Sequence, residues 1–170
     1  FDTSGRNFAV AMDIGTTTVY GQALDVNTGE VLAQHGEFNS QISYGEDVIS
    51  RIVFAEKGNG LEILHQKVVE TINKIIEKIV KKAGIGVHEI STITLAGNST
   101  MTQLLLNINP TYIRKEPYVP ASILYPPFRA TKIGLHLAEH TIALIYPGVS
   151  SYVGGDIIAG IMASGMYLSD

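Results

Sequence analysis

The sequence of 170 residues contains no cysteine and few charged residues. Without cysteine, this stretch of chain cannot form a disulfide, a thiolate zinc site or a cysteine-ligated iron–sulfur cluster. Charged residues make up 16% of the chain and hydrophobic residues 45%. That balance is typical of a folded globular domain rather than a disordered segment, and the length is sufficient for one domain with its own core.

An excess of positive charge is also missing. Twelve Lys and Arg residues stand against 16 Asp and Glu residues, so the formal net charge is −4. A general nucleic-acid binder needs a basic face, which this composition disfavours. No apolar run reaches the roughly 18 residues of a membrane span, and the polar start, Phe1 to Arg6, is unlike a signal peptide. We therefore expect a cytoplasmic domain that binds neither nucleic acid nor a membrane.

Both ends of the sequence suggest a piece of a longer protein. The first residue is Phe1 rather than Met, and a polar stretch leads directly into an apolar run. The sequence stops at Asp170, just after a helical pattern, without a tail. We expect residues 1–7 to be a linker remnant and residues 8–170 to form the domain. The alternative is a complete small protein with a processed N-terminus.

The hydrophobic pattern alternates between strand and helix periodicities. Short apolar runs bounded by turn residues predict strands, and apolar residues at spacings of three and four predict helices. A long helical pattern begins at Leu61 and ends in lysines, and Gly84 is the expected place for it to stop. The predicted strands cover residues 8–12, 19–26, 30–38, 90–96 and 141–149, and the other predicted helices cover residues 46–55, 101–106 and 157–166.

This order, β-β-β-α-β-α-β-α, leads to the predicted fold class. Three antiparallel strands followed by αβ crossovers form an α/β mixed sheet with helices on both faces, a ribonuclease-H-like layout. Residues 110–140 interrupt the pattern, because five of the six prolines fall there and forbid long regular elements. We expect this segment to be irregular, and either functional or anchored by its own side chains.

A tight turn after the first predicted strand carries the first candidate site, with the sequence Asp-Ile-Gly-Thr-Thr-Thr. Gly15 allows the backbone to come close to a ligand. The backbone amides and hydroxyls of Thr16, Thr17 and Thr18 can donate to phosphate oxygens. Asp13 offers an oxygen ligand for Mg²⁺, through bound waters. The alternative is a plain hairpin whose threonines serve only the strand.

Two later turns have a similar position, between the end of a strand and the start of a helix. Asn98 and Ser99 lie where ligands of open α/β sheets gather. Either residue can instead cap the next helix without any ligand. Gly154, Gly155 and Asp156 open the last predicted helix. Asp156 either caps that helix or faces a nucleotide, where it would position magnesium-bound water or a nucleophile.

Together these motifs resemble a known family. Residues 13–18 resemble the first phosphate motif of the actin, sugar-kinase and heat-shock-chaperone (ASKHA) superfamily. Residues 44–52, 96–102 and 152–160 resemble strings in the ATP-dependent reductive activators of corrinoid proteins, which are often labelled ferredoxin-like or metal-binding. The resemblance spans nearly all of residues 7–168.

The resemblance implies a function. Such activators use ATP to drive an uphill electron transfer that reduces an inactive cob(II)amide on a partner corrinoid protein to cob(I)amide, the methyl-accepting state. An N-terminal iron–sulfur domain supplies the electron, and that cluster would belong to the parent protein because this chain has no cysteine. The ATPase part has two ribonuclease-H-like halves with the nucleotide between them, and this chain resembles the first half.

The resemblance also implies roles for the candidate residues, with ATP and Mg²⁺ as cofactors. Asp13 would orient Mg²⁺ through water. Asp156 occupies a position where relatives place an acidic or amide residue near the magnesium and the attacking water. Asp13 and Asp156 are therefore the predicted catalytic pair. The predicted nucleotide-binding residues are Gly15, Thr16, Thr17, Thr18, Asn98, Ser99, Gly154 and Gly155.

One motif of the superfamily is missing from the sequence. The second phosphate hairpin is expected just after Asp170, together with most adenosine contacts, in a second ASKHA half. The last predicted helix, 157–166, would then lie between the halves, and its small residues fit close packing there, although ordinary core packing explains them too. In this chain alone, the outer face of that helix would be exposed or covered by a homodimer contact.

The residues leave other functions open. An ASKHA-type small-molecule kinase needs a substrate cleft, which the sequence does not exclude. An activator of a 2-hydroxyacyl-CoA dehydratase usually carries a cluster-binding cysteine pair, which is missing. A non-enzymatic assembly module would use the nucleotide as a structural ligand. A ribonuclease-H-type nuclease would need converging carboxylates and a basic face.

Overall fold

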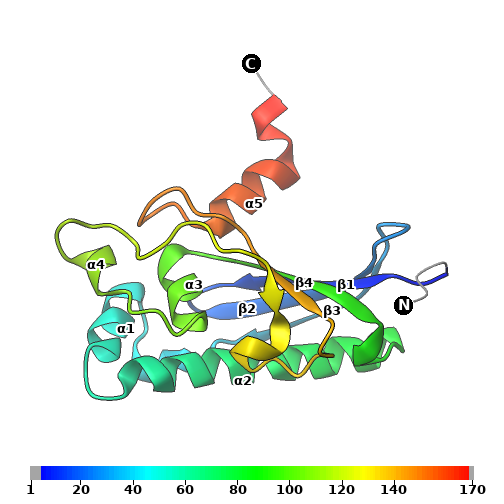
Figure 1. Cartoon of the computed structure of the whole chain (residues 1–170), viewed down its shortest axis with the longest axis horizontal. Coiled ribbons are helices and arrows are strands. Elements are labelled where there is room, and N and C mark those ends of the chain that lie inside the picture. Colours follow the sequence, from blue (N-terminus) through cyan, green and yellow to red (C-terminus); the bar gives the residue numbers. More distant parts are fainter. Residues whose placement is uncertain (1–4, 169–170) are drawn as a thin grey trace.

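The computed structural model describes residues 5–168, so parts of the expected linker (1–4) and of the expected domain (169–170) lie outside the described residues. Six strands form one sheet in the order β3-β2-β1-β4-β6-β5 (Figure 1). The strands are β1 (Phe8–Ile14), β2 (Thr18–Asp25), β3 (Val31–Phe38), β4 (Ile90–Gly97), β5 (Phe128–Arg129) and β6 (Ile142–Ile145). The helices are α1 (Val48–Ala55), α2 (Gly60–Ala83), α3 (Ser99–Leu105), α4 (Thr111–Arg114) and α5 (Gly155–Ser164), with 3₁₀ turns η1 (Ser40–Tyr44), η2 (Val87–Glu89), η3 (Ala130–Ile133) and η4 (Met166–Leu168).

The pairing of the strands confirms the predicted mixed sheet. β1, β2 and β3 form an antiparallel meander, and β4 and β6 then add parallel to β1 and to each other. A parallel neighbour requires a crossover, and α2 supplies it between β3 and β4. The fold is therefore the α/β, ribonuclease-H-like arrangement that the order of elements predicts.

Helix α2 covers one face of the sheet. Its residues Leu64, Val68, Ile72 and Ile75 recur at spacings of three and four and are fully buried in the core, and the helix contacts β2 and β3. Gly84 ends the helix in the left-handed conformation, with φ of 65°, as predicted. In residues 5–168, none of the helices combines the length and the apolar character that a membrane crossing requires.

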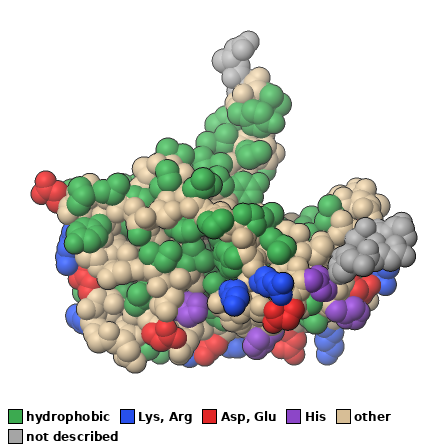
Figure 2. Space-filling model, viewed as in Figure 1, with side chains coloured by type: hydrophobic (Ala, Val, Ile, Leu, Met, Phe, Trp, Pro, Cys, Tyr) green, Lys and Arg blue, Asp and Glu red, His purple; other side chains and the backbone are tan. Residues whose placement is uncertain are grey.

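The opposite face of the sheet is more open. Along β1, Val10 and Met12 point into the core and are buried, whereas Ala11 is half-buried and Asp13 is exposed on the other face. Helix α5 stands on this face beside β4 and projects away from the sheet, and within it only Gly155 is buried (Figure 1). Figure 2 shows hydrophobic side chains along α5 and charged side chains gathered on the side where α2 runs.

Residues 110–140 are more regular than predicted, because they contain α4, β5 and η3. Strand β5 pairs antiparallel with β6, with Phe128 opposite Ala143 and Arg129 opposite Ile142. A two-residue strand and a four-residue helix are too short to show a periodicity in the sequence. The prediction of an irregular segment was wrong at these elements, and the sheet gains an edge strand that the sequence did not indicate.

The predicted strand 141–149 is also shorter in the structure. β6 stops at Ile145, although the backbone amide of Tyr146 still donates a 2.9 Å hydrogen bond to the carbonyl of Leu95. Pro147 cannot donate to a ladder, so the strand does not continue through it. The other predicted boundaries lie within about two residues of the observed ones, which is the usual uncertainty of such limits.

Candidate functional site

A cleft of about 500 Å³ lies between the open face of the sheet and α5. Asp13, near the end of β1, and Asp156, in the first turn of α5, both line it. Asp13 is paired with Ala96 of the parallel strand β4, so the carboxyl ends of two neighbouring strands meet here. Open α/β sheets bind ligands at such ends. The other lining residues are Ala11, Met12, Tyr20, Gln22, Thr94, Ala96, Tyr146, Ala159, Gly160 and Ala163.

Asp13 and Asp156 lie close enough for one charge to act on the other. Asp13 is only partly covered by the walls of the cleft, but this partial burial raises its pKa above the ordinary value of 3.8, and the negative charge of Asp156 raises it further. A cation bound beside the two carboxylates would relieve this repulsion. Mg²⁺ is usually held by one or two carboxylates, waters and phosphate oxygens, which this pair fits. Within residues 5–168, no cluster of three or more His, Asp or Glu side chains is placed to hold a metal ion.

The turn after β1 has its carbonyl oxygens tied to the protein interior. The side chain of Asn39 donates to the carbonyl of Gly15 at 2.9 Å, and its backbone amide donates to the carbonyl of Thr17 at 2.8 Å. The guanidinium of Arg51 donates to the carbonyl of Thr16 at 2.6 Å. Because the N–H of a trans peptide points opposite to its C=O, the amides of these peptide units face away from Asn39 and Arg51. Consecutive amides that face outward can bind phosphate.

The residues of this turn have different surroundings. A Cβ on Gly15 would lie 2.5 Å from the carbonyl oxygen of Thr18, so the turn itself requires glycine whether or not a ligand approaches. The hydroxyl of Thr16 accepts a 3.2 Å hydrogen bond from the side-chain amide of Asn98. Thr17 and Thr18 are exposed.

Asn98 and Ser99 take separate roles at the start of α3. Asn98 is the N-cap, since its side-chain oxygen accepts from the backbone amide of Met101 at 2.9 Å. Ser99 is buried, and its hydroxyl donates to the carbonyl of Ser150 at 2.7 Å, which holds the loop before α5. Asn98 contacts the turn after β1, whereas the hydroxyl of Ser99 is turned toward the loop at Ser150.

Gly154 and Gly155 allow α5 to start close to neighbouring backbone. A Cβ on Gly154 would lie 2.5 Å from the Cα of Asn98, and a Cβ on Gly155 would lie 2.7 Å from the carbonyl oxygen of Tyr146. Gly154 is the N-cap of α5. Asp156 lies in the first turn of the helix, where its negative charge interacts favourably with the helix dipole. The structure thus brings together the three turns that the sequence singled out. The binding and catalytic roles of their residues remain predictions.

Sequence reasoning missed the residues beneath the turn. Arg51 lies within residues 44–52, which were considered only for their family resemblance, yet its side chain is completely buried. Its spacing of four from Ala55, another buried residue of α1, was a signal that it lies on the inner face of that helix. Nothing in the sequence indicated that Asn39 is buried. Its burial follows from the approach of the end of β3 to Gly15, which is distant in the sequence.

Comparison with known proteins identifies related chains. The family described as the RACo middle region matches residues 8–169. The corrinoid activation enzyme RamQ of Eubacterium limosum is 40% identical over 113 residues, which cover 66% of this chain and 19% of RamQ. A solved structure described as a reductive activator for corrinoid, iron-sulfur protein superimposes with a TM-score of 0.95 at 44% identity, over 99% of this chain and 27% of that one. The chain thus spans less than a third of the length of either relative.

Proposed function

The chain belongs to the RACo middle-region family, and from this membership we propose that it forms the first half of the ATP-binding domain of a reductive activator. The parent protein would use ATP to drive electron transfer to a corrinoid protein, from Co(II) to Co(I). The relatives described as activators of corrinoid proteins support this proposal.

The observation that carries the proposal is the position of Asp13 and Asp156 in one cleft, beside a turn whose carbonyls are bonded to the buried Asn39 and Arg51 and whose amides therefore face away from them. The amides and the hydroxyls of Thr17 and Thr18 would bind phosphate oxygens. Asp13 would orient Mg²⁺ through water, and Asp156 would hold the attacking water. Bound Mg²⁺ would neutralise charge on the phosphates.

The exposed side of α5 supports the expectation of a second half. Ile157 and Met162 of this helix are 49% and 55% exposed, and Gly160 has open space around it. Apolar surface of this kind fits a neighbouring domain better than solvent. The second ASKHA half would supply the other phosphate hairpin and most adenosine contacts. The electron would come from an iron–sulfur domain elsewhere in the parent protein, since this chain has no cysteine.

The test uses the full-length parent protein with Asp13→Ala and Asp156→Ala. We expect each variant to fold, as judged by circular dichroism, and to lose ATP hydrolysis and ATP-dependent reduction of the corrinoid protein by about 100-fold or more. Glu46→Ala is the matched control, because Glu46 is an exposed acid outside the cleft. Unchanged turnover in both aspartate variants would refute the roles proposed for them.

A further inference from the structure

Arg51 is the largest fully buried side chain of residues 5–168, and it lies directly behind the turn after β1. Every acceptor of its guanidinium is neutral. These acceptors are the carbonyl of Gly45 (2.8 Å, from Nε), the side-chain oxygen of Gln41 (3.1 Å, from Nη1), the Sδ of Met101 (3.2 Å, from Nη1) and the carbonyl of Thr16 (2.6 Å, from Nη2).

No carboxylate in the described part of the chain forms an ion pair with Arg51. Burial lowers the pKa of Arg51 to about 10, and the charge of Asp47 acts in the opposite direction. Asp47 is exposed, and its carboxylate accepts from the backbone amide of Ser50 at 2.8 Å to cap α1. The guanidinium therefore stays charged at neutral pH. A buried charge without a counter-ion is costly.

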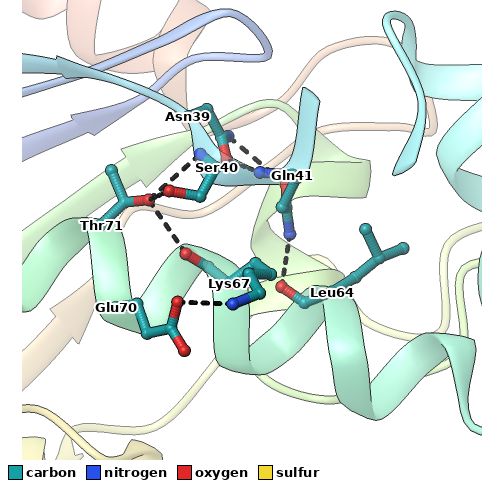
Figure 3. Close-up of polar contacts among 7 residues, drawn as sticks. All are labelled: Asn39, Ser40, Gln41, Leu64, Lys67, Glu70 and Thr71. Atoms are coloured by element: carbon teal, nitrogen blue, oxygen red, sulfur yellow. Dashed lines mark hydrogen bonds and ion pairs between the residues drawn. The ribbon is translucent and has the colours of Figure 1, made fainter. Parts of the chain in front are cut away.

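The groups around Arg51 are fixed by further hydrogen bonds. The side-chain amide of Gln41 donates to the carbonyl of Leu64 in α2 at 2.8 Å, and the side-chain oxygen of Asn39 accepts from the backbone of Gln41 at 3.0 Å (Figure 3). Asn39 also holds the carbonyl of Gly15. Asn39 and Gln41 are fully buried, so the turn is linked through a buried polar network to the longest helix of the domain.

We propose that Arg51 is a positioning residue for the phosphates of a bound nucleotide. It holds the carbonyl of Thr16 inward, which keeps the amide of the same peptide unit directed at the phosphates, and its charge attracts them from behind the turn. The polyphosphate then acts as the counter-ion that the described residues do not provide. Charge interactions across a few ångströms of protein are stronger than in water. This inference rests on the proposed nucleotide-binding function.

The experiment compares Arg51→Met and Arg51→Lys in the full-length protein by calorimetry, with MgATP and adenosine as probes. Arg51→Met should lower the affinity for MgATP about 10- to 100-fold and the affinity for adenosine by less than about threefold. Arg51→Lys keeps the charge but not the planar fork of donors, so it should recover part of the MgATP affinity. A purely structural role would not separate the two probes.

Thr71→Val is the matched control, because Thr71 is buried in the neighbouring network but does not contact the turn. Its hydroxyl donates to the carbonyl of Lys67, and its oxygen accepts from the hydroxyl and the backbone amide of Ser40 (Figure 3). Valine has nearly the same shape and cannot form these bonds. This variant should lower stability and leave the ratio of MgATP to adenosine affinity unchanged.

The outcomes separate the inference from the function on which it rests. A folded Arg51→Met protein that binds MgATP like the wild type overturns the inference, and so does an equal loss for MgATP and adenosine. If Arg51→Met does not fold, a selective loss of MgATP in Arg51→Lys, absent in Thr71→Val, supports the inference, and no selective loss overturns it. Wild-type protein that binds no MgATP refutes the proposed function itself, and this inference with it.

Discussion

The side-chain amide of Asn98 donates a 3.2 Å hydrogen bond to the hydroxyl of Thr16, which joins the start of α3 to the turn after β1. The oxygen of the same side chain caps α3 through the backbone amide of Met101. One atom of Asn98 therefore serves the stability of a helix, and the other holds the candidate phosphate turn. Substitutions can separate these two roles.

Asn98→Ala removes both hydrogen bonds, so we expect a loss of about 1 kcal/mol of stability from the missing cap, which lowers Tm by about 2–4 °C. Asn98→Asp keeps the capping oxygen and loses the donor to Thr16. This variant should therefore melt close to the wild type while the full-length protein binds MgATP more weakly. Thermal denaturation and calorimetry measure the two effects. Wild-type MgATP affinity in Asn98→Asp would show that the contact to Thr16 does not matter for binding.

Asp13→Asn should stabilise the protein without metal at neutral pH. The folded pKa of Asp13 is raised above its ordinary value of 3.8, so the ionised carboxylate destabilises the folded state at pH values above the raised pKa. Asparagine removes this effect, and Tm should rise by about 1–3 °C at pH 7 in the presence of EDTA. The gain should shrink as the pH falls through the raised pKa toward 3.8, because Asp13 is then neutral in the wild type as well.

The control for this pH series is Glu46→Gln, which removes an acid at an exposed position. Melting curves between pH 4 and pH 7 measure the difference in Tm between each variant and the wild type. A gain for Asp13→Asn that stays constant with pH, or a loss at neutral pH, would contradict the burial and repulsion inferred for Asp13.

Gly154→Ala and Gly160→Ala should change stability in opposite directions, although both lie at α5. A Cβ at position 154 would meet the Cα of Asn98 at 2.5 Å, so α5 must shift and stability should fall by about 1–3 kcal/mol. Nothing lies within 4 Å of a Cβ at position 160, so alanine there should stabilise the helix by about 0.5–1 kcal/mol. Chemical denaturation of both variants tests this. Equal effects at the two positions would contradict the close contact of Gly154 with Asn98.

The elements that periodicity predicts well are those whose burial follows from their own sequence. In α2, apolar residues every three or four positions and a glycine at position 84 were sufficient to place the helix and its end. The meander β1–β2–β3 followed from short apolar runs and turn residues. β5 could not be predicted, because its two residues form a strand only where the end of a long loop meets β6.

The candidate site also contains residues that the sequence indicated and residues that it did not. The sequence indicated the three turns at Asp13, Asn98 and Asp156, because glycines, hydroxyls and acids at strand ends form a local pattern. It did not indicate Asn39, and for Arg51 it offered only the spacing to Ala55, since polar side chains are usually placed at the surface and the burial of these two depends on contacts between distant segments. The residues that support the candidate turn are therefore harder to predict from a sequence than the turn itself.

The most direct measurement is a crystal structure of the full-length protein with Mg²⁺ and a non-hydrolysable ATP analogue. We expect phosphate oxygens to accept hydrogen bonds from amides of the turn at residues 15–18. We also expect Mg²⁺ to be linked to Asp13 through water, with Asp156 beside it. A nucleotide bound outside the cleft between the sheet and α5 would contradict the proposed function. So would Mg²⁺ held by other residues while Asp13 and Asp156 point away from it.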